Sequence, residues 1–216
     1  MSGFEVLNDA GVVLINSDQK HTIFDSIVTP GMLNTGDYNV STPFGNVSSL
    51  AYLNYNFKRE DGYLYWIQFT ANNGWGYPGA NLFVPNSIRV IRTSRNKPNV
   101  SGYLDVFDAS GNLVWSAASA ATMPRIMGFL DVAGNVNLEG RVVSVTPGFN
   151  PFFLWNNCFG QWSDDGFAVG YSGNLMRWTG SQLQTTWIRN NQKSFAEIFS
   201  GRGRLKIPYA RFQGYN

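Results

Sequence analysis

Residues 106–116 read VFDASGNLVWS, and residues 6–17 contain a close echo of them, VLNDAGVVLINS. In each copy apolar residues lead into a turn of Asn, Asp and Ala or Ser, and the turn ends at Gly11 or Gly111. Asn and Asp hydrogen-bond their own backbone in turns, and Gly takes the positive φ that closes a type I turn with a bulge. Both stretches are therefore predicted to be β-hairpins. The recurrence leaves two explanations open, an internal duplication or two hairpins with the same turn chemistry.

The rest of the chain also indicates short strands. Residues 204–209, RLKIPY, alternate apolar and basic side chains, and Pro208 among them predicts a position at the edge of a sheet. Residues 63–69, YLYWIQF, are apolar on both faces, so the strand must be covered on both, within a sandwich or by another subunit. Helices are predicted only as short pieces within 116–124 and 191–199. The predicted fold is all-β, an antiparallel β-sandwich of Greek-key or jelly-roll type with many hairpins and at most short helices.

The composition agrees with a folded β protein that has much contact surface. Among 216 residues there are 23 Gly, 16 Phe, 10 Tyr and 7 Trp, while charged residues make up only 14%. Such a low charged fraction excludes a disordered chain. Glycines supply turns between short strands, and aromatic side chains are enriched at protein interfaces. We expect one unit over residues 1–216, and residues 94–99 are the candidate boundary if the unit divides into two lobes.

Residue types that carry chemistry are scarce. His21 is the only histidine and Cys158 the only cysteine, which excludes a cage of several histidines and an internal disulfide. We therefore predict no metal site and no cofactor. The adjacent acids Glu60–Asp61 and Asp164–Asp165 each precede a glycine, as in turns between strands. Paired catalytic carboxylates are not evident, so we expect no enzymatic activity, and a glycosidase that uses these acids is the remote alternative.

Residues 72–81, NNGWGYPGAN, form the first candidate binding segment. Trp75 and Tyr77 stand among glycines and a proline, so they either pack down as a plug or are held out toward a ligand. If they are held out, their amphipathic rings suit a glycan or a protein receptor, and Asn73 and Asn81 offer hydrogen-bond donors and acceptors.

Two further segments are candidates for an interface between subunits. Residues 148–162 are so rich in aromatic side chains that they predict either core or subunit contact. The chain after residue 188 is basic, which indicates a solvated or subunit-facing strand more than a nucleic-acid site, because no block of like charges occurs. The candidate interface residues are Phe149, Phe152, Phe153, Trp155, Arg202, Arg204 and Lys206.

The two hairpin segments, GFEVLNDAGVVLINSD (3–18) and YLDVFDASGNLVWSA (103–117), lie in a body rich in glycine and aromatic residues and poor in cysteine. In these features the chain resembles the small all-β proteins found with the tail-tip and tail-fibre proteins of long-tailed bacteriophages. The resemblance implies a virion component that is assembled in the cytoplasm of the host bacterium by symmetric contacts. It supplies no catalytic or ligand-binding residues.

We therefore expect a non-enzymatic protein of the phage tail tip or tail fibre that provides structural docking or decoration. Its expected partners are other tail proteins and copies of itself. The alternative is a lectin-like, receptor-binding tail protein that contacts a host surface glycan or an outer-membrane protein. The sequence shows neither a secretory signal at its start nor an apolar run of about 18 residues, so we expect no membrane insertion, and we expect no nucleic-acid partner.

Overall fold

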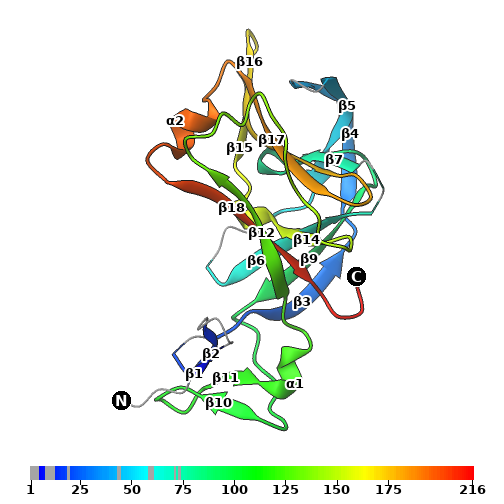
Figure 1. Ribbon diagram of the computed structural model, residues 1–216. Helices are drawn as coiled ribbons and strands as arrows, with labels where there is room; N and C mark the ends of the chain where they lie inside the picture. Colours follow the sequence, from blue (N-terminus) through cyan, green and yellow to red (C-terminus); the bar gives the residue numbers. More distant parts are fainter. Residues whose placement is uncertain are drawn as a thin grey trace.

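The computed structural model of the chain describes residues 5–7, 13–18, 20–42, 45–57, 61–70, 72 and 74–216. Strands make up 53% of the structure, and its two α-helices are short. Every pairing between the described strands is antiparallel. The predicted all-β, antiparallel fold is therefore confirmed. Figure 1 shows an eight-stranded sheet above, a six-stranded sheet in the middle and a small lobe below.

The six-stranded sheet is built around strand β6, the segment that is apolar on both faces. Tyr65 and Ile67 of β6 face the main core, whereas Trp66 faces a second cluster with Phe212 on the opposite side of the sheet. β6 is thus covered on both faces within one chain, as predicted for a central strand. In order, the strands are β12 (Arg125–Ala133), β18 (Arg204–Arg211), β14 (Phe152–Leu154), β6 (Tyr63–Phe69), β9 (Ile88–Ser94) and β3 (Ile23–Val28).

Pro208 does not lie on an edge strand, so that prediction was wrong. β18 pairs with β12 on one side and with β14 on the other. The pairing with β14 involves only Tyr209 and Ala210, and the chain after β14 turns into a short 3₁₀ helix, η2 (Trp155–Asn157). Pro208 is tolerated inside the sheet because the neighbouring strand ends beside it.

The eight-stranded sheet carries the longest hairpins. β16 is its organising strand, since its first half pairs with β15 and its second half with β7, while β17 runs along its other side. In order, the strands are β13 (Val143–Val145), β17 (Leu183–Asn190), β16 (Val169–Trp178), β7 (Gly74–Tyr77), β8 (Leu82–Phe83), β5 (Gly45–Asn54) and β4 (Gly31–Thr42), with β15 (Gly160–Asp164) paired to β16.

The main hydrophobic core lies between the two sheets. Ile67 and Phe69 from the six-stranded sheet share a buried cluster with Met176, Trp178 and Trp187 from the eight-stranded sheet. Helix α2 (Phe195–Phe199) closes one end of this core with two buried phenylalanines. The face of the eight-stranded sheet that is turned away from this core carries a separate buried apolar cluster, which comes from β4, β5, β7, β8, β16 and β17. Tyr171 of this second cluster, and Tyr52 packed against it, also line a groove.

The two echoing segments form two equivalent hairpins. In β1 (Glu5–Leu7) and β2 (Val13–Asn16), Val6 pairs with Ile15 and the register shifts after Val6. In β10 (Asp105–Phe107) and β11 (Leu113–Ser116), Val106 pairs with Trp115 and the register shifts after Val106. The pairing and the bulge are thus the same at an offset of one hundred residues, and both hairpins are confirmed. The turn of the first copy lies outside the described residues.

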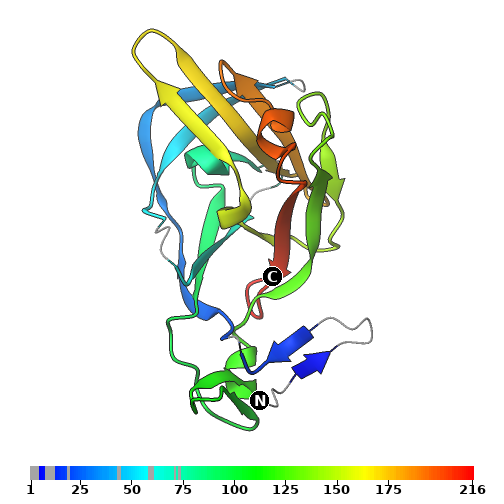
Figure 2. The same ribbon diagram turned by 90° about the vertical axis from the view of Figure 1, so that its left-hand side faces the viewer.

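Both hairpins lie at the same end of the molecule, and with helix α1 (Ala117–Ala120) they form the small lobe (Figures 1 and 2). The chain enters the lobe from β9 through residues 95–99. Val106 and Val114 are buried there, but much of the lobe is held by hydrogen bonds. Ser119 links α1 to the segment before β10, because its hydroxyl accepts a hydrogen bond from Val100 N at 2.8 Å and donates one to Val100 O at 3.3 Å.

Candidate functional site

Tyr77, a candidate ligand residue, is packed down into the fold. Its side chain is fully buried, and its hydroxyl accepts a hydrogen bond from Gln161 N at 3.0 Å. The carbonyl oxygens of Gln161 and Ser172 both lie within reach of the hydroxyl proton. Burial raises the pKa of the Tyr77 phenol above its usual range. Of the two alternatives predicted for this segment, the plug describes Tyr77, which therefore anchors β15 and β16 instead of meeting a ligand.

The other residues of that segment do not gather around one site. Trp75 is half-buried and packs against the second apolar cluster of the eight-stranded sheet, with the guanidinium of Arg177 4.5 Å from its ring centre. Asn81 has a left-handed backbone (φ 56°) after the 3₁₀ helix η1 (Pro78–Ala80), and its carbonyl accepts from Leu53 N at 2.9 Å. Asn73 lies outside the described residues. The segment thus serves mainly to join β7 to β8.

The aromatic candidates for a subunit interface lie inside the chain. Phe152 and Phe153 are fully buried on opposite faces of the six-stranded sheet, and Trp155 is buried in the main core. The indole of Trp155 donates to Pro78 O at 2.9 Å. Phe149 is half-buried, with the guanidinium of Arg211 4.2 Å from its ring centre. For Phe152, Phe153 and Trp155 the core alternative therefore describes the structure.

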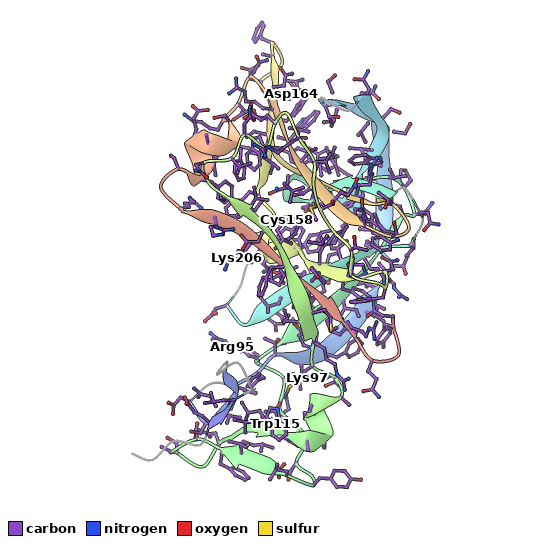
Figure 3. The ribbon with its side chains drawn as sticks, in the orientation of Figure 1. Arg95, Lys97, Trp115, Cys158, Asp164 and Lys206 are labelled. Carbon is purple, nitrogen blue, oxygen red and sulfur yellow. The ribbon has the colours of Figure 1, made fainter. Side chains whose placement is uncertain are left out.

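The basic candidates are exposed and have partners within the chain. Arg204 forms an ion pair with Asp131 at 2.7 Å. The guanidinium of Arg202 lies 5.5 Å from the ring centre of Phe159. Lys206, labelled in Figure 3, has its ammonium 5.8 Å from the ring centre of Phe129. Arg204 and Lys206 are thus exposed on β18 and Arg202 lies just before it, each with an acidic or aromatic neighbour in the chain.

The acidic pairs occupy separate turns. Asp61 is exposed and forms an ion pair with Arg95, whereas Asp164 lies at the far end of the molecule from the small lobe (Figure 3). Asp165 accepts hydrogen bonds from Phe167 N and Ala168 N, which lower the pKa of its carboxyl. Glu60 lies outside the described residues. Within the described ranges no group of three or more His, Cys, Asp or Glu could hold a metal ion.

A groove between the β15–β16 hairpin and strands β4 and β5 joins aromatic and polar side chains. Trp162 on β15 and Tyr171 on β16 are directly opposed in the antiparallel ladder, and their rings stack with centres 5.3 Å apart and planes at 9°. Tyr52 of β5 lines the same groove, whose volume is about 720 Å³. Around these rings lie Asn39 and Ser41 of β4, Asp164 of β15, Val169 of β16 and Asn190 of β17.

Sequence reasoning missed this groove, although part of its signal was present. Trp162 and Tyr171 flank the turn that SDDG begins, and that turn fixes them as neighbours in a hairpin. The opposite wall comes from β4 and β5, more than 100 residues earlier in the chain. The hydroxyl of Tyr171 accepts from Ser41 N at 3.3 Å and joins the two walls. Only the folded sheet reveals that contact.

The small lobe presents a second candidate surface, which is apolar. Leu7, Val100, Leu104 and Phe107 are 51–67% exposed, and Tyr103 is fully exposed. Tyr103 also has a left-handed backbone, with φ of 64°. This conformation is rare for a large residue, and such backbone strain is found mainly at functional sites. We call these five residues the lobe patch. Large exposed apolar side chains gathered in one lobe are typical of a protein-binding surface.

Comparison with known proteins places the chain in a family and gives no further relatives. Residues 1–214 match the family model described as Domain of unknown function (DUF8377). No curated protein and no solved structure matches the chain. Among the described residues, no helix has the length and apolar character needed to cross a membrane.

Proposed function

The chain belongs to the DUF8377 family, and we propose that it is a non-enzymatic virion protein of a bacteriophage tail tip or tail fibre. In this role it docks on neighbouring tail proteins and on copies of itself, and it is assembled in the host cytoplasm. The phage assignment rests on the resemblance of its two hairpin segments to tail proteins. The docking role rests on the lobe patch.

The lobe patch supports docking because its large apolar side chains are mostly exposed to water and not packed within the chain. Large apolar side chains in contact with water favour association, and a lobe with few buried apolar residues gains stability when a partner covers it. The lobe is fixed to the six-stranded sheet, since Phe24 N of β3 donates to Thr122 O at 2.9 Å. Lys97 also donates from its ammonium to Phe24 O at 3.0 Å. A partner bound to the lobe is thereby connected to the rigid sandwich.

The test is incorporation of the chain into phage particles. Leu104→Glu together with Phe107→Glu places two charges in the lobe patch, and we expect particles made with this variant to contain at least about tenfold less of the chain, as for loss of an interface hot spot. Phe167→Glu is the matched control, because Phe167 is fully exposed at the β15–β16 hairpin, at the opposite end of the molecule (Figure 1). Equal incorporation of both folded variants would contradict the docking role.

A receptor-binding, lectin-like role is the second candidate, and the groove of Trp162 and Tyr171 favours it. Docking through the lobe leaves the opposite end of the molecule free to face outward, and the groove lies near that end, where Asp164 is labelled in Figure 3. The two roles are compatible in one tail protein. They differ in the surface used, so substitutions in the lobe and in the groove separate them.

A further inference from the structure

We infer that a cationic pocket beside the first half of β18 binds an extended, carboxylate-rich segment of a partner protein. The pocket lies between β18, the turn that follows α2 and the 3₁₀ helix η2, and its volume is about 490 Å³. Lys206, which lines it, lies at the side of the molecule, away from the small lobe and from the end marked by Asp164 (Figure 3). The inference extends the docking role to a second surface and does not rest on the phage assignment.

The pocket exists because β14 ends before β18 does. β14 pairs with β18 only at Tyr209 and Ala210, and the chain then turns into η2. Among the described residues, no strand therefore lies beside residues 204–208 on this side of β18. The side-chain amide of Asn157 instead donates to Lys206 O at 2.8 Å, in the place of a strand's main chain. The interruption of the sheet leaves room for a ligand next to β18.

The turn that carries Arg202 is held in place by main-chain hydrogen bonds. Phe199 O, at the end of α2, accepts from Arg202 N at 2.9 Å and from Gly203 N at 3.1 Å. Gly134 N donates to Gly203 O at 2.7 Å and ties the turn to the end of β12. Gly203 has a left-handed backbone with φ of 77°, which glycine adopts without strain. A ligand therefore meets a preformed turn, which lowers the entropy cost of binding.

The charge of the pocket favours an anion. Arg202, Arg204 and Lys206 line it and are exposed, and no acidic side chain lines it among the described residues. Arg202 and Lys206 each lie near an aromatic ring and form no ion pair with a described residue. Arg204 donates to Asp131 through Nε, so its two NH₂ groups remain able to donate to a second carboxylate. Hydrogen bonds between cations and carboxylates are the strong ones, which makes carboxylates suitable ligands here.

The spacing of the cations and the apolar lining fit an extended peptide. Arg204 and Lys206 are two residues apart on one strand, so their side chains leave the same face about 7 Å apart. An extended peptide presents its own alternate side chains at the same interval, so two acidic groups separated by one residue match the two cations. Phe159 and Phe199 also line the pocket. An apolar side chain of the same segment gains contact there that a free inorganic anion does not.

A nucleic acid is disfavoured as the ligand. It needs a basic track along its backbone and aromatic faces on which its bases stack. Arg189 and Lys193, which precede α2 in the chain, lie 3.8 Å and 3.6 Å from the carboxylate of Glu197 and so do not extend the pocket into such a track. The ring of Phe199 is buried and offers no face to a base. Three cations in one pocket instead suit the carboxylates of a short segment.

The experiment measures binding of synthetic peptides by the full chain in the absence of phage particles. A short blocked peptide with Glu at alternate positions and Ala or Leu between them is compared by calorimetry with the same peptide carrying Gln in place of Glu. We expect the acidic peptide to bind at low salt with a Kd of about 1 mM or tighter, and the Gln peptide at least about tenfold more weakly. Raising the ionic strength to about 0.3 M should weaken the acidic peptide at least about threefold.

Three outcomes would overturn the inference. The first is that the acidic peptide does not bind, and the second is that both peptides bind equally at every salt concentration. Inorganic phosphate and a short oligothymidylate form the comparison panel. The third outcome is that either of these binds at the pocket as tightly as the acidic peptide, which would make it a site for another anion.

Substitutions and chemical shifts locate the site. Arg202→Gln together with Lys206→Gln is expected to weaken binding of the acidic peptide at least about tenfold. Arg211→Gln is the matched control, because Arg211 is also an exposed arginine near a phenylalanine ring, at the other end of β18, but does not line the pocket. In the unsubstituted chain, the peptide should shift the amide NMR signals of residues 202–206 and leave those of residues 100–107 unchanged. Equal affinity of the folded variants, or shifts only outside the pocket, would refute the assignment.

The outcome is distinguishable from failure of the docking role, because peptide binding is measured on the isolated chain and incorporation into particles on the variants of the lobe patch. If the acidic peptide does not bind but the lobe variants are excluded from particles, the docking role survives and the inference about the pocket does not. Peptide binding at the pocket with normal incorporation of the lobe variants gives the opposite result.

Discussion

Replacing Tyr77 with Phe removes a single oxygen from the centre of the contact between β7 and the β15–β16 hairpin. The hydroxyl accepts one hydrogen bond, from Gln161 N, and donates its one proton to a neighbouring carbonyl, of Ser172 or Gln161. Phe fills the same space, so the ring packing against this hairpin is kept. The substitution therefore isolates the hydrogen bonds from the burial of the ring.

The expected loss follows from those two hydrogen bonds. Each contributes about 0.5–1.5 kcal/mol net, so Tyr77→Phe should lower the free energy of unfolding by about 2 kcal/mol. For a domain of this size, each kcal/mol corresponds to about 2–4 °C, which gives a decrease in Tm of roughly 4–8 °C. Urea unfolding followed by tryptophan fluorescence measures the free energy, and circular dichroism measures the Tm.

Tyr103→Phe is the matched control for this prediction. It removes the same oxygen from a fully exposed tyrosine in the small lobe, where a change within about 0.5 kcal/mol is expected. If Tyr77→Phe and Tyr103→Phe have equally small effects, the Tyr77 hydroxyl does not hold β15 in place.

Three further predictions concern other parts of the fold. Gly160→Ala should destabilise the chain by about 2–3 kcal/mol, because its Cβ would lie 2.5 Å from Tyr77 Cε2. Gly140→Ala is the control, since the space around that Cβ is open and no destabilisation is expected. Equal urea midpoints of the two variants would contradict the prediction. Hydrogen bonds from the N-cap of α2 hold the pKa of Glu197 at about 2, below its ordinary 4.5. The difference in the free energy of unfolding between the wild type and Glu197→Gln should therefore be full above about pH 5 and should vanish as the pH falls toward 2. A difference that is constant with pH would refute this prediction. Burial raises the pKa of the Cys158 thiol, so Ellman's reagent at pH 8 should label the native chain far more slowly than the chain in guanidinium, and similar rates would show an accessible thiol.

Local turn chemistry and hydrophobic pattern were sufficient to predict much of the fold. The Asp108 turn illustrates this, because its carboxylate accepts from Ser110 N and Asn112 N, the contacts expected of Asp in a hairpin loop. β6 was recognisable because apolar residues on both faces require cover on both. In both cases the information lies within about ten residues of sequence.

Contacts between distant segments could not be predicted in the same way. A loop rich in glycine permits Tyr77 to point inward or outward, and the structure selects the inward position because Gly160 and Gly173 leave space for its ring. The groove likewise depends on β4 lying opposite Trp162. Pro208 was misassigned because the sequence does not show where the neighbouring strand, β14, ends.

The most direct test of the docking role is hydrogen–deuterium exchange of the chain, measured free and after addition to purified phage tails that lack it. Residues 100–107 contain four of the five members of the lobe patch, and their amide exchange should become slower in the bound chain while exchange in the groove strands β15 and β16 stays unchanged. Binding to the tails with unchanged exchange in residues 100–107 would show that another surface docks and would contradict the proposal.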